Sequence, residues 1–290
     1  MSAAYPLSIV IVNYRTAALT RALVESLHAA PTVPFETLVI DNASPDGEAA
    51  QLAADLAGHP HVRLVANPAN TYFSAAYSQG IAAAAGEYIL VLNPDMLARG
   101  NVIGQLLAAV QRDPDVGAAT TNLHHPDGTV QRNGSRFTGF GYLILHYTLI
   151  GKVWGALFPA SIRRIEGHLW YADWDRLSAR EVDVLPGCCI IAHREVWRQA
   201  GAFDARMKMY FSDDYFSRRV QALGKRTEYL ITDGLIHYEG ASAKQVSAWA
   251  LRVYLADLLT YTRLVFGPAA WLILGVLLIP TYLVQRLRAR

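Results

Sequence analysis

A chain of 290 residues is long enough for one large domain or two closely joined ones. Its 26 basic and 24 acidic residues nearly cancel, so no overall positive field favours nucleic acid as a partner. Hydrophobic residues make up 52% of the chain, which is high for a soluble protein, and the excess lies late in the sequence. These features predict a soluble body with a membrane-contacting end.

The first half of the chain alternates apolar runs with helical patterns. Apolar runs rich in β-branched residues predict strands at 7–12, 36–40, 62–66 and 88–91. Apolar spacing and small residues between them predict helices at about 16–30, 48–57 and 73–85. Thr16 is expected to cap the first helix, and the small residues of the third can lie close on a sheet. Strands that alternate with helices imply right-handed crossovers, so we expect an α/β fold with a doubly wound parallel sheet.

Polar side chains follow these strands. The first strand ends in Asn13-Tyr14-Arg15, which lacks the glycine loop of a nicotinamide dehydrogenase. The later strands lead to Asp41, to Asn70 and to Asn93-Pro94-Asp95. Because the carboxyl ends of parallel strands face one crevice, these side chains can meet one ligand. Asp95 is the first candidate for the chemistry, and a turn with a helix cap is the alternative interpretation.

The second half of the chain adds two adjacent carboxylates. We expect further strands at 116–121, at 182–192 with a break at Pro186-Gly187, and at 227–231. Further helices are expected at 101–112, 194–199 and 213–223. Asp213 and Asp214 open the last of these helices, where capping is the simple interpretation. Two neighbouring acids also make one of them easier to protonate, which suits a general base or acid near neutral pH. His237 follows the last strand, where a lone histidine is more often structural than a ligand.

Two local features bear on the compartment. Cys188 and Cys189 are adjacent, and neighbours on a strand point to opposite faces, so we interpret them as small buried side chains in a reducing compartment. Residues 1–6 lack a basic region followed by an apolar core, so they do not form a secretory signal. We therefore expect the catalytic body to stay in the cytoplasm.

The stretch 137–159 is rich in aromatics, glycine and aliphatics, with Lys152 as its only formally charged residue. Its glycines break it too often for a simple membrane span. Two interpretations stay open, a membrane-facing loop and an ordinary buried insertion.

The carboxyl-terminal region predicts membrane association. An amphipathic helix is expected over 247–263, and no charged residue occurs from 264 to 284, about the length that spans a bilayer core. Gly267-Pro268 and Pro280 weaken a straight helix. Arg286, Arg288 and Arg290 would cross against the positive-inside tendency in a true span. An in-plane or re-entrant arrangement is therefore slightly preferred to a span, and a buried core helix is the remaining alternative.

Several separated motifs occur together in one order. They are the strand 8–14, the turn 41–47, Asn70 with Phe73 ahead of Gly80, 92–95, 201–204 before 210–213, and Ile236-His237. In this order the chain resembles a family 2 glycosyltransferase with the GT-A type nucleotide-sugar-binding fold, most closely the bacterial rhamnosyltransferase-like branch. The resemblance runs from about 7 to 238. It implies a mostly parallel central sheet, with residues 1–95 as the nucleotide-binding half, 96–240 as the acceptor-binding and catalytic half, and 241–290 as membrane-associated helices.

The resemblance also implies roles for individual residues. Asp41 matches the acid that reads the base, and the nucleotide pocket would further include Asn13, Tyr14, Asn70, Phe73 and Asn93. Asp95 and His237 match metal ligands that would hold Mn²⁺ or Mg²⁺ against the donor diphosphate. Asp213 matches the general base, and Asp214 could share or take that role. The chain departs from the family pattern at four positions, namely Tyr72, Ser78, Ser212 and Tyr215.

The implied activity is inverting, metal-dependent transfer of a sugar from a UDP- or dTDP-sugar. Rhamnose is one candidate sugar, and the acceptor would be a glycan or a polyprenyl-diphosphate-linked molecule in cell-envelope polysaccharide synthesis. The enzyme would sit on the cytoplasmic face of the cell membrane, in contact with membrane lipid. Two alternatives stay open. A sugar-nucleotide nucleotidylyltransferase would need a glycine-rich basic loop after the first strand, and a non-catalytic, membrane-anchored nucleotide-sugar binder would not need Asp213 or Asp214.

Overall fold

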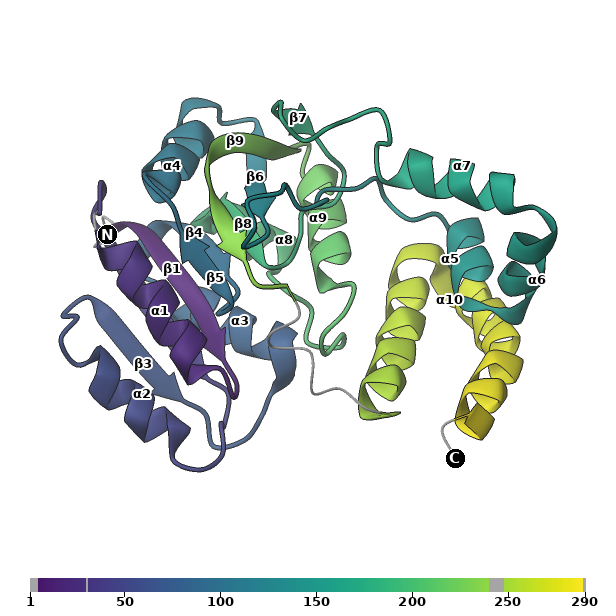
Figure 1. Ribbon diagram of the computed structural model, residues 1–290, viewed down its shortest axis with the longest axis horizontal. Coiled ribbons are helices and arrows are strands. Elements are labelled where there is room, and N and C mark those ends of the chain that lie inside the picture. The colour runs from purple at the N-terminus through teal and green to yellow at the C-terminus, as the bar shows by residue number, and fades with distance from the viewer. Residues whose placement is uncertain (1–4, 30, 240–247, 289–290) are drawn as a thin grey trace.

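The computed structural model describes residues 5–29, 31–239 and 248–288. One mixed sheet organises the α/β body, in the order β3-β2-β1-β4-β8-β6-β9-β5, with β7 paired to β9 (Figure 1). Its strands are β1 (Tyr5–Asn13), β2 (Phe35–Asp41), β3 (Val62–Ala66), β4 (Gly86–Leu92), β5 (Met96–Ala98), β6 (Val116–His124), β7 (Arg180–Glu181), β8 (Cys189–His193) and β9 (Arg226–His237).

The first four strands confirm the parallel, doubly wound prediction. β1 pairs in parallel with both β2 and β4, and β2 with β3. β8 then runs antiparallel between β4 and β6, which restores the original direction for β6 and β9. The sheet is therefore mostly parallel, with short antiparallel strands in its second half.

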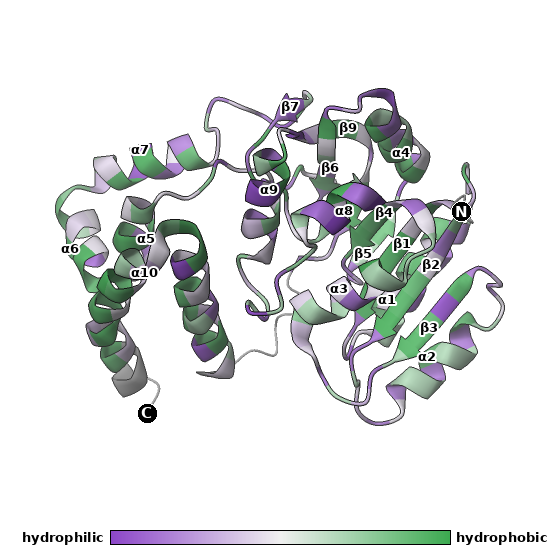
Figure 2. Ribbon diagram, turned by 180° about the vertical axis from the view of Figure 1, so that it is seen from behind, coloured by the Kyte–Doolittle hydropathy of each residue, from purple (hydrophilic) through white to green (hydrophobic). Residues whose placement is uncertain are grey.

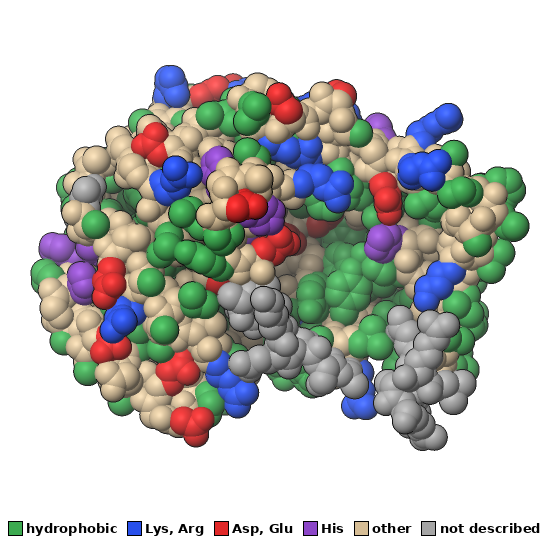
Figure 3. Space-filling view, viewed as in Figure 1, with side chains coloured by type: hydrophobic (Ala, Val, Ile, Leu, Met, Phe, Trp, Pro, Cys, Tyr) green, Lys and Arg blue, Asp and Glu red, His purple; other side chains and the backbone are tan. Residues whose placement is uncertain are grey.

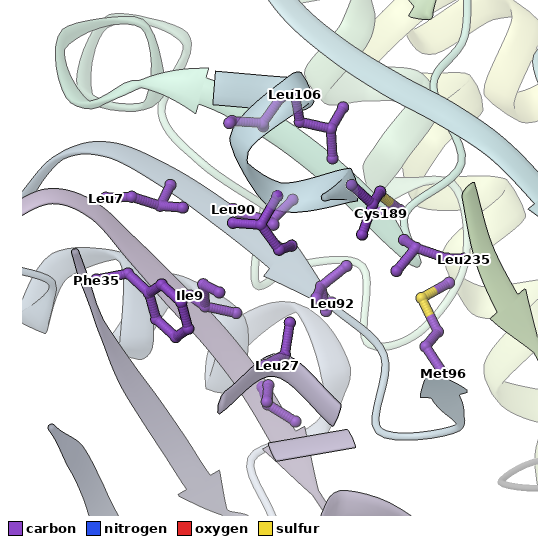
Figure 4. Close-up of a cluster of buried hydrophobic side chains, with 14 of the residues drawn as sticks. Leu7, Ile9, Leu27, Phe35, Leu90, Leu92, Met96, Leu106, Cys189 and Leu235 are labelled. Atoms are coloured by element: carbon purple, nitrogen blue, oxygen red, sulfur yellow. The ribbon is translucent and has the colours of Figure 1, made fainter. Parts of the chain in front are cut away.

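Helices cover both faces of the sheet (Figures 1 and 2). They are α1 (Ala17–His28), α2 (Glu48–Leu56), α3 (Tyr72–Ala83), α4 (Val102–Arg112), α8 (Arg194–Ala200) and α9 (Ser212–Ala222). The period of two along β1 sends Leu7, Ile9 and Ile11 into the core beneath α1 and α4, part of which is drawn in Figure 4. Val10 and Val12 enter the second core, which α3, α8 and α9 cover.

Three local expectations need correction. Thr16 does not cap α1 with its side chain, because its hydroxyl donates to Asn13 Oδ1, and Glu48 Oε1 accepts from the Ala17 N–H instead. In the stretch 182–192, the regular strand is β8, which begins only at Cys189, after the turn at Pro186. The strand expected over 227–231 is longer, because β9 continues to His237.

The stretch 137–159 is not a loop. It forms α5 (Phe140–Tyr147) and α6 (Leu149–Leu157), and α7 (Pro159–Leu169) follows. Glycine does not break these helices, since Gly151 lies against the backbone of Leu145 at the junction of α5 and α6, where a side chain would not fit. The expectation failed because close packing between two short helices selects glycine as readily as a loop does.

The carboxyl-terminal segment α10 (Ala248–Arg288) is two helices joined at a kink. Gly267 has φ 86° and ψ 177°, and Pro268 starts the second helix. The two halves fold back on each other and pack on α5, α6 and α9 (Figures 1 and 2). A third apolar cluster holds this part together, with buried members Leu143, Met207, Leu258, Tyr261, Leu274 and Leu278. We call residues 248–288 the hairpin.

The hairpin has the length and composition of a membrane segment. Among the described residues, Trp249–Val284 is the one stretch apolar enough to cross a membrane. Its most apolar 18-residue window has mean hydropathy 2.1 and is 22% buried. That low burial argues against an ordinary core helix. The kink at Gly267 excludes one straight helix over this stretch.

Gly80 sets how closely α3 approaches the sheet. A Cβ at this position would overlap the Val10 side chain and lie 3.3 Å from Ile40 Cγ1. Gly80→Ala should therefore lower the free energy of unfolding by about 1–3 kcal/mol, although alanine favours helix. Denaturant unfolding in mild detergent measures the change.

Gly155 in α6 provides a matched control. A Cβ there meets Ile162 at 3.5 Å, an ordinary contact. Gly155→Ala should leave stability unchanged or raise it by up to about 1 kcal/mol. Equal effects of the two substitutions would contradict the close approach of α3.

Candidate active site

The candidate site lies where β1, β2 and β4 end. The parallel register pairs Asn13 with Asp41, so the two side chains meet. Asn13 Nδ2 donates to Asp41 Oδ2 at 2.7 Å, and its Oδ1 accepts from the Thr16 and Thr20 hydroxyls. The Ser44 N–H donates to the other oxygen of Asp41 at 3.0 Å. Asn13 is fully buried, so its observed role is to orient the Asp41 carboxylate.

Asn42 is a site residue that the sequence reasoning missed. Its Oδ1 accepts from the Thr71 N–H at 2.9 Å, and its Nδ2 donates to Asn70 Oδ1 at 2.9 Å and to the Tyr72 carbonyl at 3.3 Å. These bonds hold Tyr72 at φ 67°, a conformation that is strained for a bulky side chain. The only signal for Asn42 was its place in the polar turn 41–47.

The other predicted nucleotide residues lie in different surroundings. Tyr14 is 40% exposed, and the Arg15 guanidinium lies 5.6 Å from its ring. Asn70 braces the loop before α3 by accepting from the Tyr72 N–H. Phe73 packs its ring against Tyr77 and Phe203 in the second core. Asn93 accepts from the Tyr77 hydroxyl at 3.2 Å, close to the end of β4.

The structure brings Asp95 and His237 together, although 142 positions separate them in the chain. Pairing of β5 with β9 places His237 opposite Met96, and the Tyr238 N–H donates to the Asp95 carbonyl. His237 Nε2 lies 3.5 Å from Asp95 Oδ1, and both side chains are buried.

Gln131 orients the His237 imidazole. Its Nε2 donates to the His237 carbonyl at 2.7 Å, so its Oε1 is the atom that faces Nδ1, at 2.9 Å. Nδ1 therefore carries the proton in this network, and Nε2 is directed at the carboxylate. This arrangement, with one ring nitrogen held by an amide oxygen and the other beside an acid, is typical of metal-binding histidines.

The chemistry of this pair fits a divalent cation that also binds a diphosphate. A carboxylate oxygen and an imidazole nitrogen are ligands for Mn²⁺ or Mg²⁺, and phosphate oxygens and water can complete the shell. Within residues 5–29, 31–239 and 248–288, no group of three or more His, Cys, Asp or Glu side chains is arranged to hold a metal ion. A cation at Asp95 and His237 would thus depend on oxygens of the donor.

The adjacent carboxylates Asp213 and Asp214 face different neighbours. Asp213 Oδ2 accepts from the Gly187 N–H at 3.0 Å, and desolvation by burial raises the pKa of its carboxyl. Asp214 accepts from the Tyr261 hydroxyl at 2.6 Å and from Arg218 Nε at 2.7 Å. Burial outweighs the Arg218 charge and raises the pKa of Asp214 to about 6. Asp214 is thus tied to the hairpin, whereas Asp213 is turned toward the turn at 187.

The turn at Gly187 and Cys188 links Asp213 to the end of β4. The Asn93 N–H donates to the Cys188 carbonyl at 2.9 Å, one residue after the bond from Gly187 to Asp213. A Cβ at Gly187 would lie 3.2 Å from Asp213 Cβ. Burial and the nearby carboxylates of Asp95 and Asp213 raise the pKa of the Cys188 thiol, and burial raises the pKa of the Cys189 thiol, so both cysteines are protonated. Asp95 and Asp213 therefore lie on either side of one short turn.

Figure 3 shows a hollow in the molecular surface between the α/β body and the helical part formed by α5–α7 and the hairpin, with hydrophobic side chains at its floor and acidic and histidine side chains at its rim. The Tyr72 ring stacks on Trp249 of the hairpin, with centroids 5.6 Å apart, and Lys208 Nζ lies 4.5 Å from the Tyr72 ring centroid. Segments from the body and the hairpin therefore meet beside the loop before α3.

Comparison with known proteins identifies the family. The model of glycosyl transferase family 2 matches residues 8–196, which is more than half of the chain. A solved structure of GalNAc-T7 with UDP, GalNAc and Mn²⁺ superposes with a TM-score of 0.63 at 14% identity, over 90% of this chain and 47% of that one. This likeness confirms the expected GT-A-like fold.

Two curated relatives share more sequence. The chain is 27% identical to the N-acetylglucosaminyl-diphospho-decaprenol L-rhamnosyltransferase of Mycobacterium tuberculosis, over 97% of this chain and 93% of the relative. It is 32% identical to the O-antigen biosynthesis protein RfbC of Myxococcus xanthus, over 78% of this chain but only 17% of that protein. Neither a nucleotidylyltransferase nor a non-catalytic binder agrees with these matches. The chain belongs to glycosyl transferase family 2 and is a glycosyl-transfer enzyme with rhamnosyltransferase relatives.

Proposed function

We propose that this enzyme is an inverting, metal-dependent glycosyltransferase that moves a sugar from a UDP- or dTDP-sugar to a lipid-linked glycan acceptor. One observation carries the proposal. The turn at Gly187 and Cys188 lies at the carboxyl edge of the sheet. On one side of it is the carboxylate and imidazole pair Asp95 and His237, and on the other is the half-buried carboxylate of Asp213. A diphosphate held at the first pair would thus lie close to a base.

Asp41 is proposed to read the nucleotide base. Asn13 and the Ser44 N–H occupy one lone pair on each oxygen of its carboxylate. The remaining lone pairs can accept the imide N–H of uracil or thymine, which both UDP and dTDP offer. Because three partners hold the Asn13 side chain in place, the direction of the carboxylate is fixed before a nucleotide arrives.

Asp95 and His237 would hold Mn²⁺ or Mg²⁺ against the diphosphate. The bound ion would stabilise the negative charge of the departing nucleoside diphosphate. Gln131 keeps His237 Nε2 directed toward Asp95, so the two ligands are preorganised. An imidazole ligand favours Mn²⁺ somewhat over Mg²⁺.

Asp213 is proposed as the general base. Its carboxylate would take the proton of the acceptor hydroxyl while the hydroxyl oxygen bonds to the anomeric carbon and the bond from that carbon to the diphosphate oxygen breaks. A single in-line displacement of this kind inverts the anomeric configuration. Gly187 orients the carboxylate, and burial raises its pKa toward the range in which a carboxylate is an effective base.

Rhamnose is the first donor sugar to test, because the relative from Mycobacterium tuberculosis is named for L-rhamnosyl transfer to an N-acetylglucosaminyl-diphospho-decaprenol. The exposed apolar hairpin supports a location on the cytoplasmic face of the cell membrane, where it would meet lipid and a polyprenyl-diphosphate-linked acceptor. Cell-envelope polysaccharide synthesis is the process that such a reaction would serve.

The base assignment predicts a split between turnover and donor binding. With a dTDP-sugar, Mn²⁺ and a lipid-linked N-acetylglucosamine acceptor, Asp213→Asn should lower kcat by about 10²–10⁴-fold and leave the donor Kd unchanged. Product formation followed by mass spectrometry measures kcat, and calorimetry measures Kd. Because burial raises the pKa of Asp213 above 3.8, wild-type kcat should fall as the pH is lowered through that raised pKa.

Asp214→Asn is the matched comparison at the neighbouring position. It keeps an oxygen that can accept from Tyr261 and Arg218 but removes the carboxylate charge, so kcat should fall less than in Asp213→Asn. A larger kcat loss at Asp214 than at Asp213 would move the base role to Asp214. Full turnover in both variants would overturn the proposed mechanism.

The metal assignment predicts that donor affinity depends on Asp95 and His237. Titration of UDP and dTDP with Mn²⁺ should show affinity that falls at least tenfold when the metal is removed. Asp95→Ala and His237→Ala should abolish this metal dependence, and Gln131→Leu should raise the Mn²⁺ concentration that it requires by about 10–100-fold. His193→Ala is a control, because His193 is half-buried opposite Tyr88 near the start of β4, away from the candidate site, and should not change the metal dependence. Metal dependence that persists in Asp95→Ala would refute the assignment.

A further inference from the structure

The helix α6 carries an exposed apolar stripe. Its members recur at helical spacing and are 42–67% exposed, namely Ile150, Val153, Trp154, Leu157 and Phe158. Five large apolar side chains on one face are more than scattered surface residues of a soluble protein, so this face calls for a covering partner. Figure 3 shows hydrophobic side chains along the outer edge of the helical part, where α6 lies.

The stripe adjoins the second half of the hairpin. The Leu149 N–H donates to Thr281 Oγ1 at 3.1 Å, and α6 packs against α10. That half of the hairpin has its own exposed apolar side chains, namely Trp271, Leu272, Ile273, Val276, Ile279 and Leu283. Figure 2 shows both helices as hydrophobic over much of their length. The two stripes therefore belong to the same outer part of the molecule.

The charged residues beside these stripes are mostly basic. No Asp or Glu occurs from 137 to 165 or after Asp257, whereas the same stretches contain several basic residues. Lys152, Arg163 and Arg164 are exposed near the α6 stripe, where Glu166 of α7 is half-buried, and Arg263 is exposed at the hairpin. An apolar face with three exposed basic side chains beside it complements a bilayer that contains anionic lipid.

We propose that α6 is a second membrane-docking surface, which lies in the interface of an anionic bilayer beside the hairpin. The inference deepens the membrane location given under the proposed function and rests on it. Trp154 and the basic residues would lie at the headgroup level, and Val153 and Leu157 would enter the apolar boundary. Two contacts would fix the orientation of the body relative to the membrane. With the hairpin as its one contact, the body would be free to rotate.

Flotation of the full-length protein with vesicles tests this surface. A triple variant of α6, Val153→Ser with Leu157→Ser and Phe158→Ser, should lower binding to vesicles of phosphatidylcholine and phosphatidylglycerol at least tenfold. The matched control changes three exposed apolar residues of the body, Leu177, Leu223 and Ile231, to serine and should bind like wild type. Lys152→Gln with Arg163→Gln and Arg164→Gln should remove the preference for anionic over neutral vesicles.

Two outcomes would overturn the inference. One is vesicle binding by the α6 variant that equals wild type. The other is that the α6 variant loses dimers in detergent, measured by light scattering, but still binds vesicles. That result would show that a second copy of the chain covers the stripe. Turnover of a short-chain, detergent-soluble acceptor is measured in parallel. If neither the wild type nor any variant transfers sugar, the proposed function fails. The vesicle result still decides whether α6 is a docking surface.

A separate observation concerns Asp257 of the hairpin. Its carboxylate is 1% exposed and accepts three consecutive backbone N–H groups, from Lys208 at 2.9 Å, Met209 at 2.8 Å and Tyr210 at 3.0 Å. This loop leads directly into α9, which carries Asp213. The next residue, Phe211, has φ 65°, so the chain enters α9 through a conformation that only its surroundings can hold.

The same loop contacts the donor side of the site. The Lys208 carbonyl accepts from the Ser74 N–H of α3, and the Ser74 hydroxyl lies 2.6 Å from the Ser212 hydroxyl at the start of α9. We infer that Asp257 is a positioning residue, which acts through the loop 208–210 to set Asp213 against the bound donor. The hairpin would then be part of the active site as well as a membrane contact.

Asp257→Asn tests this role, because the amide puts an NH₂ group against N–H donors and keeps the size of the side chain. It should lower kcat at least tenfold while the Kd for UDP with Mn²⁺ stays within twofold of wild type. Thr262→Val is the control, since Thr262 is buried on the same helix and its hydroxyl bonds only within that helix. Asp257→Glu restores the charge and should recover part of kcat, and it serves as the folded variant if the asparagine variant unfolds. Wild-type kcat in a folded Asp257→Asn, or parallel losses in kcat and donor affinity, would overturn the inference.

Discussion

Burial of carboxylates is the constraint on which this site depends. A carboxylate that leaves water loses several kcal/mol of solvation free energy unless donors surround it. Asp41, Asp214 and Asp257 are each at most 7% exposed, and each is bonded to donors, from segments up to 49 positions away in the sequence. Asp41 joins β2 to β1, Asp214 joins α9 to the hairpin, and Asp257 joins the hairpin to the loop before α9. The need to satisfy these acids therefore fixes the segments of the site relative to one another.

The sequence predicted the features that depend on local pattern. The period of two in β1 and the alternation of strands and helices gave the parallel half of the sheet, and polar strand ends located Asp41 and Asp95 at one edge. It did not predict the antiparallel insertion of β8 or the bonds of Gly187 and Asn42, because these depend on partners at least 26 positions away. The glycines of 137–159 misled in the same way, since Gly151 is selected by a packing contact between two helices.

Adjacent acids in a sequence cannot be assigned different roles without their neighbours. On a helix, consecutive side chains point about 100° apart, so Asp213 and Asp214 meet different parts of the fold. Asp214 meets Arg218 one turn later and Tyr261 of the hairpin, and both bonds would weaken if it took up a proton. Among the described residues, the donors to Asp213 are the backbone N–H groups of Gly187 and Asp214, so the carboxyl can gain or lose a proton with little rearrangement. This difference is the physical reason to assign proton transfer to Asp213 and a structural role to Asp214.

The pKa of Asp214 shows what that structural role costs. Its folded-state pKa of about 6 lies above the ordinary value of 3.8, so the folded protein binds the proton more tightly than the unfolded chain does. Stability is therefore highest below pH 3.8 as far as this group is concerned and falls as the pH rises toward 6, by about 3 kcal/mol in all. A buried apolar residue would avoid this loss. The acid instead gives α9 a directional bond to the hairpin, as Asp257 gives one from the hairpin to the preceding loop. If the hairpin lies in a membrane, lipid contact acts through both acids on the start of the helix that carries Asp213.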